Sequence, residues 1–375
     1  MNNKVIYVKC FGKNVGRIAM TKNYCCAFEY DDEWLLNGFS ISPRSLPLIK
    51  RVFVADREPF RGNFGVFEDS LPDGWGRLLI DRMLLKKGLL PSDVGILDRL
   101  AIVAKSGCGA LEYEPGENWF DGNLSVSQLD DLAKECEKIL KDDNYESGQL
   151  ATLTEKGGSS GGARPKILIK IDGEDWIIKF PSSFDPKTAG KQEYLYSVAA
   201  KEAKIEMSET RLFENKYFGT KRFDRENGQK YHILSASGLL ELSHRYPSLD
   251  YNDLFSAALQ LSKNFADIEK IFRLMCFNVF AKNLDDHSKN FSFIYKDGKW
   301  GISPAYDLTF SGGFNGERAT TVNGNGKNPS IADILAVAKK NGINETKAKN
   351  ICEEVQTAVN KILGIKEEIL GTGKY

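Results

Sequence analysis

The segment from Asn283 to Asn290, followed by Pro304–Leu308, carries the side chains of this chain best suited to chemistry. It supplies an Asp, an Asn and a second Asp in the order Asp285, Asn290 and Asp307. In phosphoryl transfer an Asp of this kind meets the substrate hydroxyl, while the Asn and the later Asp hold metal against phosphates. Mg²⁺ prefers hard oxygen ligands and neutralises the charge of the transferred group. The pattern therefore predicts phosphoryl transfer from a nucleotide.

Spacing assigns separate roles to the acidic and amide side chains of this segment. Asp285 lies five residues before Asn290, so we expect Asp285 to orient a hydroxyl and accept its proton. Asn290 and Asp307 are expected to coordinate magnesium. Asp286 has no role in this pattern, and we expect it to tolerate change.

Two further side chains of the segment have open roles. His287 either takes part in catalysis or is a hydrogen-bonded structural residue. Lys289 either offsets negative charge near the transferred phosphoryl or is simply solvated.

A Gly/Ser-rich stretch, Gly157–Lys166, comes just before a pair of expected strands. Glycines let a backbone approach phosphate closely, so Ser160, Gly161 and Gly162 are expected to bind ATP. The stretch has neither the Walker pattern nor the G-x-G-x-x-G of ordinary protein kinases. A flexible linker is the alternative.

Lys179 lies within the apolar strand sequence Trp176–Phe180. A buried ammonium needs a partner, and ATP phosphates together with Glu193 of the next helix would provide one. The alternative is a Lys that points outward from a half-buried strand.

The segment Thr220–Arg225 resembles the connection between the lobes of a kinase. Lys221 and Phe223 are expected to lie beside the nucleotide, with Phe223 against the base, and Asp224 is expected to reach the ribose. A plain strand end with a charged turn is the alternative.

Composition limits the class of protein. The 375 residues are 42% hydrophobic, enough for two or three lobes. Lys plus Arg and Asp plus Glu number 51 each, which argues against a dedicated nucleic-acid binder. Seven scattered cysteines without a C-x-x-C pair suggest reduced thiols, and no apolar run approaches a membrane span. We expect a cytoplasmic protein without membrane contact.

Hydrophobic spacing and turn residues indicate where the elements lie. Residues 4–30 alternate as a hairpin or meander does, and 142–148 is expected to be a polar connection into the Gly/Ser stretch. Other expected elements are helices at 75–87, 128–141, 189–203, 250–283, 331–341 and 345–364, and strands at 167–171, 176–180 and 216–224.

With these motifs in order, the chain resembles the HipA family of bacterial serine/threonine kinases, the toxin halves of HipBA-type toxin–antitoxin modules. Arg164-Pro165 departs from the Gln-Pro or Gln-Glu of many members. The matching segments are Asp32–Trp34, Ser45–Pro47, Phe67–Arg77, Gly107–Tyr113, Gly161–Lys166, Ile178–Pro181, Arg222–Arg225, Asp286–Asn290 and Tyr306–Leu308.

The resemblance implies an α+β, protein-kinase-like two-lobe fold. Its parts would be a β-rich N-terminal subdomain at 1–115, an N-lobe with the Gly/Ser-rich loop at 116–225, and a mainly helical C-lobe at 226–375. It also implies ATP binding by Lys179 and a catalytic Asp285.

In this family a Gly-loop serine is autophosphorylated, which ejects the loop and switches the kinase off. Ser159 matches that position best, counting back from Lys166, and Ser160 is adjacent. A phosphoserine adds about −1.5 to −2 charge and would compete for donors that cradle phosphate.

The resemblance further implies a HipB-like antitoxin with a helix-turn-helix as partner, and DNA contact only through that antitoxin. Its expected substrate is an aminoacyl-tRNA synthetase, in particular glutamyl-tRNA synthetase, whose modification blocks translation. Two other interpretations stay open. The chain could act mainly as a co-repressor in a DNA-bound complex, or phosphorylate a lipid or small molecule on the same scaffold.

Overall fold

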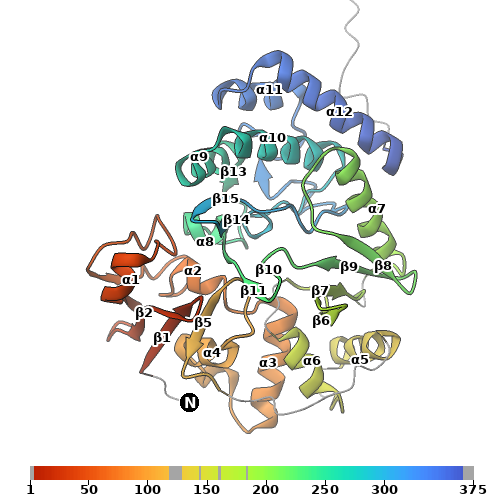
Figure 1. The fold of residues 1–375 in the computed structure, drawn as a ribbon. Coiled ribbons are helices and arrows are strands. Elements are labelled where there is room, and N and C mark those ends of the chain that lie inside the picture. The colour runs from red at the N-terminus through yellow and green to blue at the C-terminus, as the bar shows by residue number, and fades with distance from the viewer. Residues whose placement is uncertain (1–3, 118–128, 143–144, 159–161, 183–184, 366–375) are drawn as a thin grey trace, which may run out of the picture. The chain divides into compact units, whose positions relative to one another are not determined.

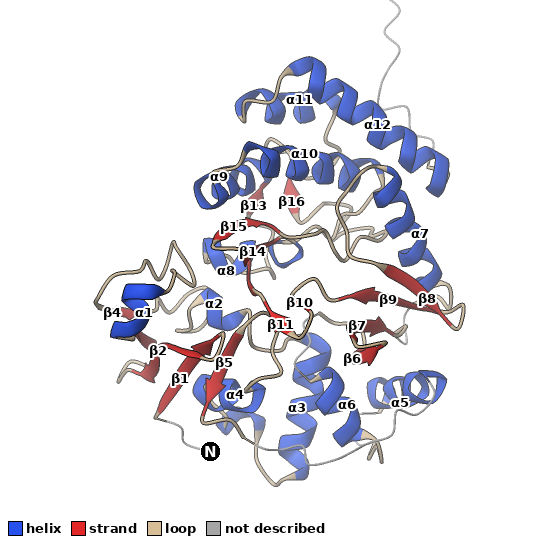
Figure 2. Ribbon diagram, viewed as in Figure 1, coloured by secondary structure: helices blue, strands red, loops and turns tan. Residues whose placement is uncertain are grey.

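The computed structural model describes residues 4–117, 129–142, 145–158, 162–182 and 185–365. The chain forms two compact units. Unit 1 comprises Met1–Gly190 and Arg211–Leu234, and unit 2 comprises Lys191–Thr210 and Ser235–Tyr375. Figure 1 colours the elements along the chain and Figure 2 separates helices from strands. The three-part division expected at 115 and 225 stays a prediction.

Unit 1 begins with a five-stranded antiparallel sheet in the order β4-β3-β2-β1-β5. In β1 and β3 every second side chain is buried, which confirms the alternation expected for residues 4–30. Helix α4 contacts β1, β2 and β5. The elements are β1 (Val5–Cys10), β2 (Lys13–Met20), β3 (Cys26–Tyr30), α1 (Asp32–Asn37), β4 (Val52–Val54), α2 (Gly65–Glu68), η1 (Pro91–Asp93), α4 (Ile96–Val103) and β5 (Leu111–Glu114).

A second sheet of four strands, in the order β6-β7-β9-β8, carries the expected Lys179 strand. Its members are β6 (Lys166–Ile171), β7 (Glu174–Lys179), β8 (Thr210–Phe213) and β9 (Tyr217–Lys221). The expected strands 167–171, 176–180 and 216–224 are confirmed in outline. A short ribbon follows, made of β10 (Arg225–Glu226) and β11 (Gln229–Lys230).

Three helices pack on this second sheet and bury its apolar side chains: α3 (Gly74–Lys86), α5 (Leu129–Lys141) and α6 (Leu150–Gly157). The sequence predicted the first two, whereas it predicted no helix at α6, which lies between the polar connection expected at 142–148 and the Gly/Ser-rich stretch. The shared core comprises Trp75, Leu79, Met83, Leu132, Cys136, Ile139, Leu150, Leu153, Ile167, Ile178, Phe180 and Tyr217.

Unit 2 is mainly helical. Its long helices are α7 (Ala189–Glu202, whose first two residues lie in unit 1), α9 (Tyr251–Ser262), α10 (Phe265–Phe280), α11 (Ile331–Lys340) and α12 (Glu345–Leu363). The shorter elements are β12 (His232–Ser235, which leads from unit 1 into unit 2), α8 (Ala236–Leu240), β13 (Leu249–Asp250), η2 (Ser288–Asn290), β14 (Ser292–Lys296), β15 (Lys299–Ile302) and β16 (Thr320–Thr321).

The helical stretch expected at 250–283 is two helices rather than one. Lys263 adopts a left-handed backbone conformation with φ +52° and ends α9. The Asn264 side chain then accepts a hydrogen bond from Ala266 N and begins α10. Helix α10 contacts α9, α12 and β15, so it forms the centre of the unit.

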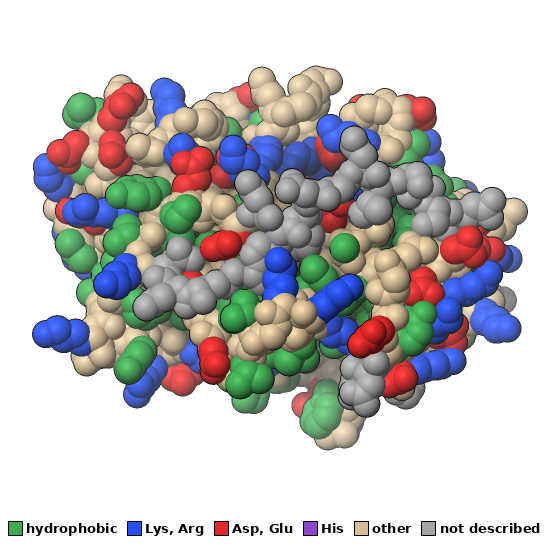
Figure 3. Space-filling model, turned by 90° about the horizontal axis from the view of Figure 1, so that it is seen from below, with side chains coloured by type: hydrophobic (Ala, Val, Ile, Leu, Met, Phe, Trp, Pro, Cys, Tyr) green, Lys and Arg blue, Asp and Glu red, His purple; other side chains and the backbone are tan. Residues whose placement is uncertain are grey.

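Surface composition agrees with the neutral net charge. Figure 3 shows one face of the molecule, on which Lys and Arg side chains are interspersed with Asp and Glu rather than gathered by sign. All seven cysteines lie in the described residues and are free thiols. Among the described helices, none is both long and apolar enough to cross a bilayer.

Candidate active site

Asp285 and Asp286 occupy opposite environments although they are neighbours in the chain. Asp285 is exposed, whereas Asp286 is only 1% exposed. The Asn290 side chain donates from Nδ2 to the Asp285 carbonyl oxygen over 2.7 Å, which closes the loop between these residues. The Asp285 carboxylate therefore lies at the surface of unit 2, where a substrate hydroxyl can approach it.

Asp286 is held by three donors from two segments of unit 2, the start of α9 and residues 318–320. Arg318 Nη2 donates to Asp286 Oδ2 over 3.0 Å, and Tyr251 OH donates to the same oxygen over 2.9 Å. Thr320 N donates to Oδ1 over 3.1 Å. The expectation that Asp286 tolerates change is therefore corrected, because removing it leaves the Arg318 guanidinium buried and unpaired.

The hydrogen bonds around Asp286 extend to the start of the loop. Asn278 Nδ2 donates to Tyr251 OH over 3.0 Å, and Asn283 Nδ2 donates to Asn278 Oδ1 over 3.0 Å. Arg318 Nη2 also donates to the Asn283 carbonyl oxygen over 3.2 Å. Burial and the Asp286 charge raise the pKa of Tyr251 well above its ordinary value, so its hydroxyl keeps its proton.

Sequence reasoning missed Tyr251, Asn278, Arg318 and Thr320. The one sequence feature that could have pointed to them is the adjacent pair of acids Asp285-Asp286. A carboxylate that is buried needs a cationic partner elsewhere in the chain, but adjacency alone does not show which of the two acids is buried.

Tyr306 connects the two expected metal-binding residues. Its hydroxyl donates to the Lys289 carbonyl oxygen over 2.6 Å. Because Tyr306 precedes Asp307 and Lys289 precedes Asn290, this bond brings the two candidate ligands into the same region of unit 2. Asp307 is half-buried and adopts φ +56°, a left-handed conformation that non-glycine residues rarely take.

The donor set fits a magnesium ion that is also bound by phosphate. The hydrogen bond from Asn290 uses Nδ2, so Oδ1 is the atom left to bind a metal. Asn290 and Asp307 would supply two hard oxygen ligands. In the part of the chain that the structure describes, no three His, Cys, Asp or Glu residues gather into a metal site. A magnesium ion here would thus take its remaining ligands from phosphates and water.

His287 has a clear structural role in the loop. It precedes the short helix η2, and its Nδ1 accepts a hydrogen bond from Lys289 N over 3.2 Å. Its ring lies 5.7 Å from that of His244. These contacts favour the structural alternative for His287, while the charge-offsetting role of Lys289 stays a prediction.

Of the nucleotide-binding residues expected in unit 1, Lys179 ends β7 and Gly162 lies four residues before the start of β6. Lys179 faces Lys166 across the strand pair, and its ammonium lies 5.6 Å from the centre of the Phe218 ring. Ser159, Ser160 and Gly161 lie outside the described residues, and Gly162 is described. Glu193 is buried on α7 in unit 2, and its pairing with Lys179 stays a prediction.

Asp224, expected to reach a ribose, is buried in unit 1 among charged partners. Arg222 Nη2 donates to it over 2.6 Å, Arg225 Nη1 over 2.7 Å and Gly109 N over 2.8 Å. Burial opposes its ionisation, but the two guanidinium groups outweigh burial and hold the pKa of Asp224 below its ordinary value. These contacts favour a structural role for Asp224, and its contact with a ribose stays a prediction.

The other two residues expected at the lobe connection are more exposed to solvent than Asp224. Lys221 pairs with Glu174 over 2.8 Å and is partly exposed. Phe223 is half-buried. Their contacts with a nucleotide stay predictions.

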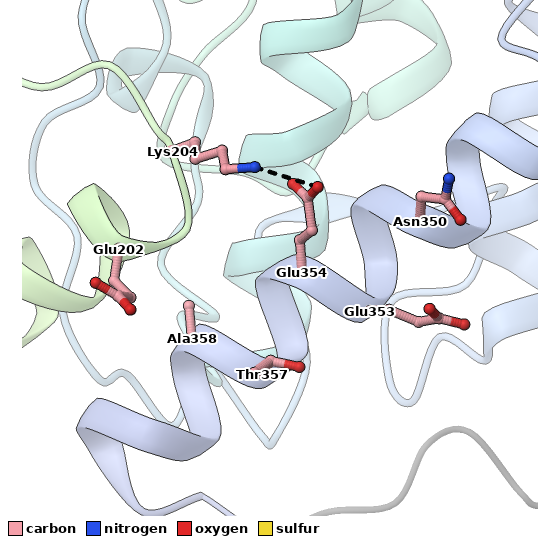
Figure 4. A pocket seen from close by; sticks show the side chains of 7 residues that line it. All are labelled: Glu202, Lys204, Asn350, Glu353, Glu354, Thr357 and Ala358. Carbon is pink, nitrogen blue, oxygen red and sulfur yellow. Dashed lines mark ion pairs between the residues drawn. The ribbon is translucent and has the colours of Figure 1, made fainter.

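Figure 4 shows a pocket on unit 2 that contains none of the expected site residues. Its volume is about 490 Å³, and it lies between the end of α7 and α12. Lys204 and Glu354 form an ion pair of 3.2 Å within it. Its lining consists of Glu202, Lys204, Asn350, Glu353, Glu354, Thr357 and Ala358. The pocket therefore does not test the roles expected for the Asp285–Asn290 loop.

The α+β fold and the loop that exposes Asp285 and carries Asn290 are features of a kinase-like protein. The family described as HipA-like C-terminal domain matches residues 158–362 of this chain. The family described as HipA N-terminal domain matches residues 6–114. Since the first of these alone covers more than half of the sequence, the chain belongs to the HipA family.

Two curated relatives come from Sinorhizobium fredii. "Putative kinase Y4mE" is 27% identical over 342 residues, covering 82% of this chain and 77% of that protein. "Putative kinase Y4dM" is 26% identical over 178 residues, and the match spans 43% of each chain. These relatives support the kinase class.

A solved structure also matches the fold. It is the Shewanella oneidensis MR-1 toxin–antitoxin system of HipA, HipB and operator DNA, with a TM-score of 0.71 at 16% identity. The match covers 96% of this chain and 91% of that chain. The expected fold class, α+β and HipA-like, is confirmed.

The contacts of Asp286 predict that it is essential for stability. Asp286→Ala should lower the free energy of unfolding by about 3–5 kcal/mol, because the buried Arg318 loses its counter-charge. Asp285→Ala, the matched control at the exposed neighbour, should change it by less than about 0.5 kcal/mol. Urea denaturation followed by circular dichroism measures both. A loss under about 1 kcal/mol for Asp286→Ala would show that the ion pair is not needed.

Proposed function

We propose that this chain is an ATP-dependent serine/threonine protein kinase and the toxin of a type II toxin–antitoxin module in the cytoplasm. The observation that carries the proposal is the arrangement of the Asp285–Asn290 loop. It exposes one carboxylate, buries the other, and joins the Asn290 and Asp307 segments through Tyr306. Membership of the HipA family and two relatives named as kinases support it.

Each group has a defined task in the proposed reaction. The substrate hydroxyl oxygen forms a bond to the γ-phosphorus, the bond from that phosphorus to the β–γ bridging oxygen breaks, and ADP leaves. Asp285 orients the hydroxyl and takes its proton. Asn290 and Asp307 hold Mg²⁺, which neutralises phosphate charge when bound.

Unit 1 supplies the groups for the nucleotide. Lys179 and the Gly162 end of the Gly/Ser-rich loop bind the ATP phosphates, with Lys221 and Phe223 beside the nucleoside. Lysine is well suited to phosphate as a compact positive charge.

The proposed partner is a HipB-like antitoxin with a helix-turn-helix, and DNA is contacted only through it. Support comes from the Shewanella structure, which holds HipA, HipB and operator DNA together. The net charge of zero gives the chain little electrostatic attraction of its own for DNA. The proposed substrate is an aminoacyl-tRNA synthetase of the glutamyl-tRNA synthetase kind.

Removing the site carboxylates should abolish phosphoryl transfer. Incubation with γ-labelled ATP, Mg²⁺ and purified glutamyl-tRNA synthetase should label the synthetase, and Asp285→Ala and Asp307→Ala should each reduce the rate by at least about 100-fold. Glu353→Ala removes an exposed carboxylate of α12 and serves as the control with unchanged rate. Undiminished transfer by both site variants would exclude this assignment. Labelling of phosphoinositides but no protein would instead indicate a lipid kinase.

Autophosphorylation of the Gly/Ser-rich loop is a separate part of the proposal. After incubation with Mg-ATP, mass spectrometry should find phosphate on Ser159 or Ser160, with none in Asp285→Ala. Ser159→Ala should raise transfer to substrate if the modification is inhibitory, because the added negative charge no longer competes with ATP for the loop donors. An unmodified loop after prolonged incubation would remove the regulatory idea and leave the kinase assignment standing.

A further inference from the structure

The two ends of the Gly/Ser-rich loop meet at Trp75 in unit 1. Trp75 lies on α3 and is 1% exposed, and its Nε1 donates to the Lys166 carbonyl oxygen over 3.2 Å. Gly157, at the other end of the loop, approaches the same atoms closely. A Cβ at Gly157 would lie 2.6 Å from the Lys166 carbonyl oxygen and 3.0 Å from Trp75 Nε1. Only glycine therefore allows both ends of the loop to close on this indole.

Gly162 is held by the first turn of α3 through both of its backbone groups. Its N–H donates to the Asp73 carboxylate, and its carbonyl oxygen accepts a hydrogen bond from Trp75 N over 3.0 Å. Asp73 precedes α3 as the N-cap residue, yet its side chain makes no cap hydrogen bond to that helix. The carboxylate is directed instead to a residue 89 positions later in the chain.

Gly74 makes this approach possible. Its φ is +43°, and a Cβ there would lie 2.5 Å from the Gly162 carbonyl oxygen and 2.7 Å from Ala163 Cα. A side chain at residue 74 would therefore push the loop away from α3. The turn Asp73–Trp75 thus has three successive residues that bond to Gly162 or approach it closely.

We propose that the turn Asp73–Trp75 is a positioning element for nucleotide binding that fixes the C-terminal end of the Gly/Ser-rich loop. The inference rests on the proposed kinase function and deepens it. Asp73–Trp75 belongs to the HipA N-terminal domain match, whereas Gly162 belongs to the HipA-like C-terminal domain match. The N-terminal domain would thus help to build the ATP site, because a loop with a fixed end loses less conformational freedom when phosphate binds.

A role in helix capping alone makes a different prediction. An N-cap carboxylate normally accepts from the second or third N–H of its own helix, and losing it lowers stability without touching a remote site. Asp73 accepts from Gly162 N, so its loss should act on the loop and on ATP affinity. Stability and affinity measured on the same variants separate the two roles.

The test uses the full-length protein with Asp73→Ala, Asp73→Asn and the control Asp93→Ala, which removes an exposed acidic residue from the short helix η1. Calorimetry gives the dissociation constant of Mg-ATP, and hydrogen exchange reports on the amide of Gly162. Asp73→Ala should weaken Mg-ATP binding about ten-fold, as expected for one lost hydrogen bond to a charged group. It should also accelerate exchange at Gly162, while kcat at saturating ATP changes less than about two-fold.

Asp73→Asn keeps a side-chain acceptor for Gly162 N and should recover most of the affinity, which also guards against a poorly folded Ala variant. Faster exchange at Gly162 with unchanged Mg-ATP affinity would overturn the proposal, as would Asp73→Ala behaving like Asp93→Ala in both measurements. If the wild type binds Mg-ATP but transfers no phosphate, the proposed kinase function fails, and the affinity and exchange measurements still decide the role of Asp73.

Discussion

The candidate catalytic loop depends on the buried ion pair between Asp286 and Arg318. Burying two charges is costly unless each is fully hydrogen-bonded, and here Tyr251 and Thr320 satisfy the remaining sites of the carboxylate. The pair ties the loop to a segment 32 residues later in the chain. It thereby fixes the backbone at Asp286, so that the neighbouring Asp285 is held at the surface.

Unit 1 also holds a short segment in place. The Gly/Ser-rich segment has little intrinsic preference for any one conformation because of its glycines. Trp75 lies between the two ends of Gly157–Lys166, and Asp73 and the Trp75 backbone engage Gly162. Both units therefore fix a short functional segment from a distant part of the chain. In unit 2 a buried ion pair fixes the catalytic loop. In unit 1 an indole and the N-terminus of α3 fix the ends of the Gly/Ser-rich loop.

The sequence predicts much of this fold because local patterns determine it. Alternation in residues 4–30 and helical spacing in 75–87 are local signals, and both are confirmed. Helix α6 was missed because its eight residues include two threonines and end in the glycine run, so its stability comes from packing against α3. The sequence also did not predict that Asp286 and Asp224 are buried. Each is buried in an ion pair, with Arg318 and Arg222 respectively, and such burial depends on tertiary contacts. The order of the family motifs in the sequence predicted the Asp285–Asn290 loop. Only the structure showed that Asp285 is exposed and Asp286 is buried.

The most direct test of the central claim is a crystal structure of the full chain with Mg²⁺ and a non-hydrolysable ATP analogue. The account predicts a metal ion within about 2.1 Å of Asn290 Oδ1 and of an Asp307 carboxylate oxygen, with phosphate oxygens and water completing its shell. Asp285 should lie outside that shell, and Asp286 should stay paired with Arg318. A nucleotide bound away from Asn290 and Asp307, or a metal ligated by Asp285 in place of Asn290, would contradict the account.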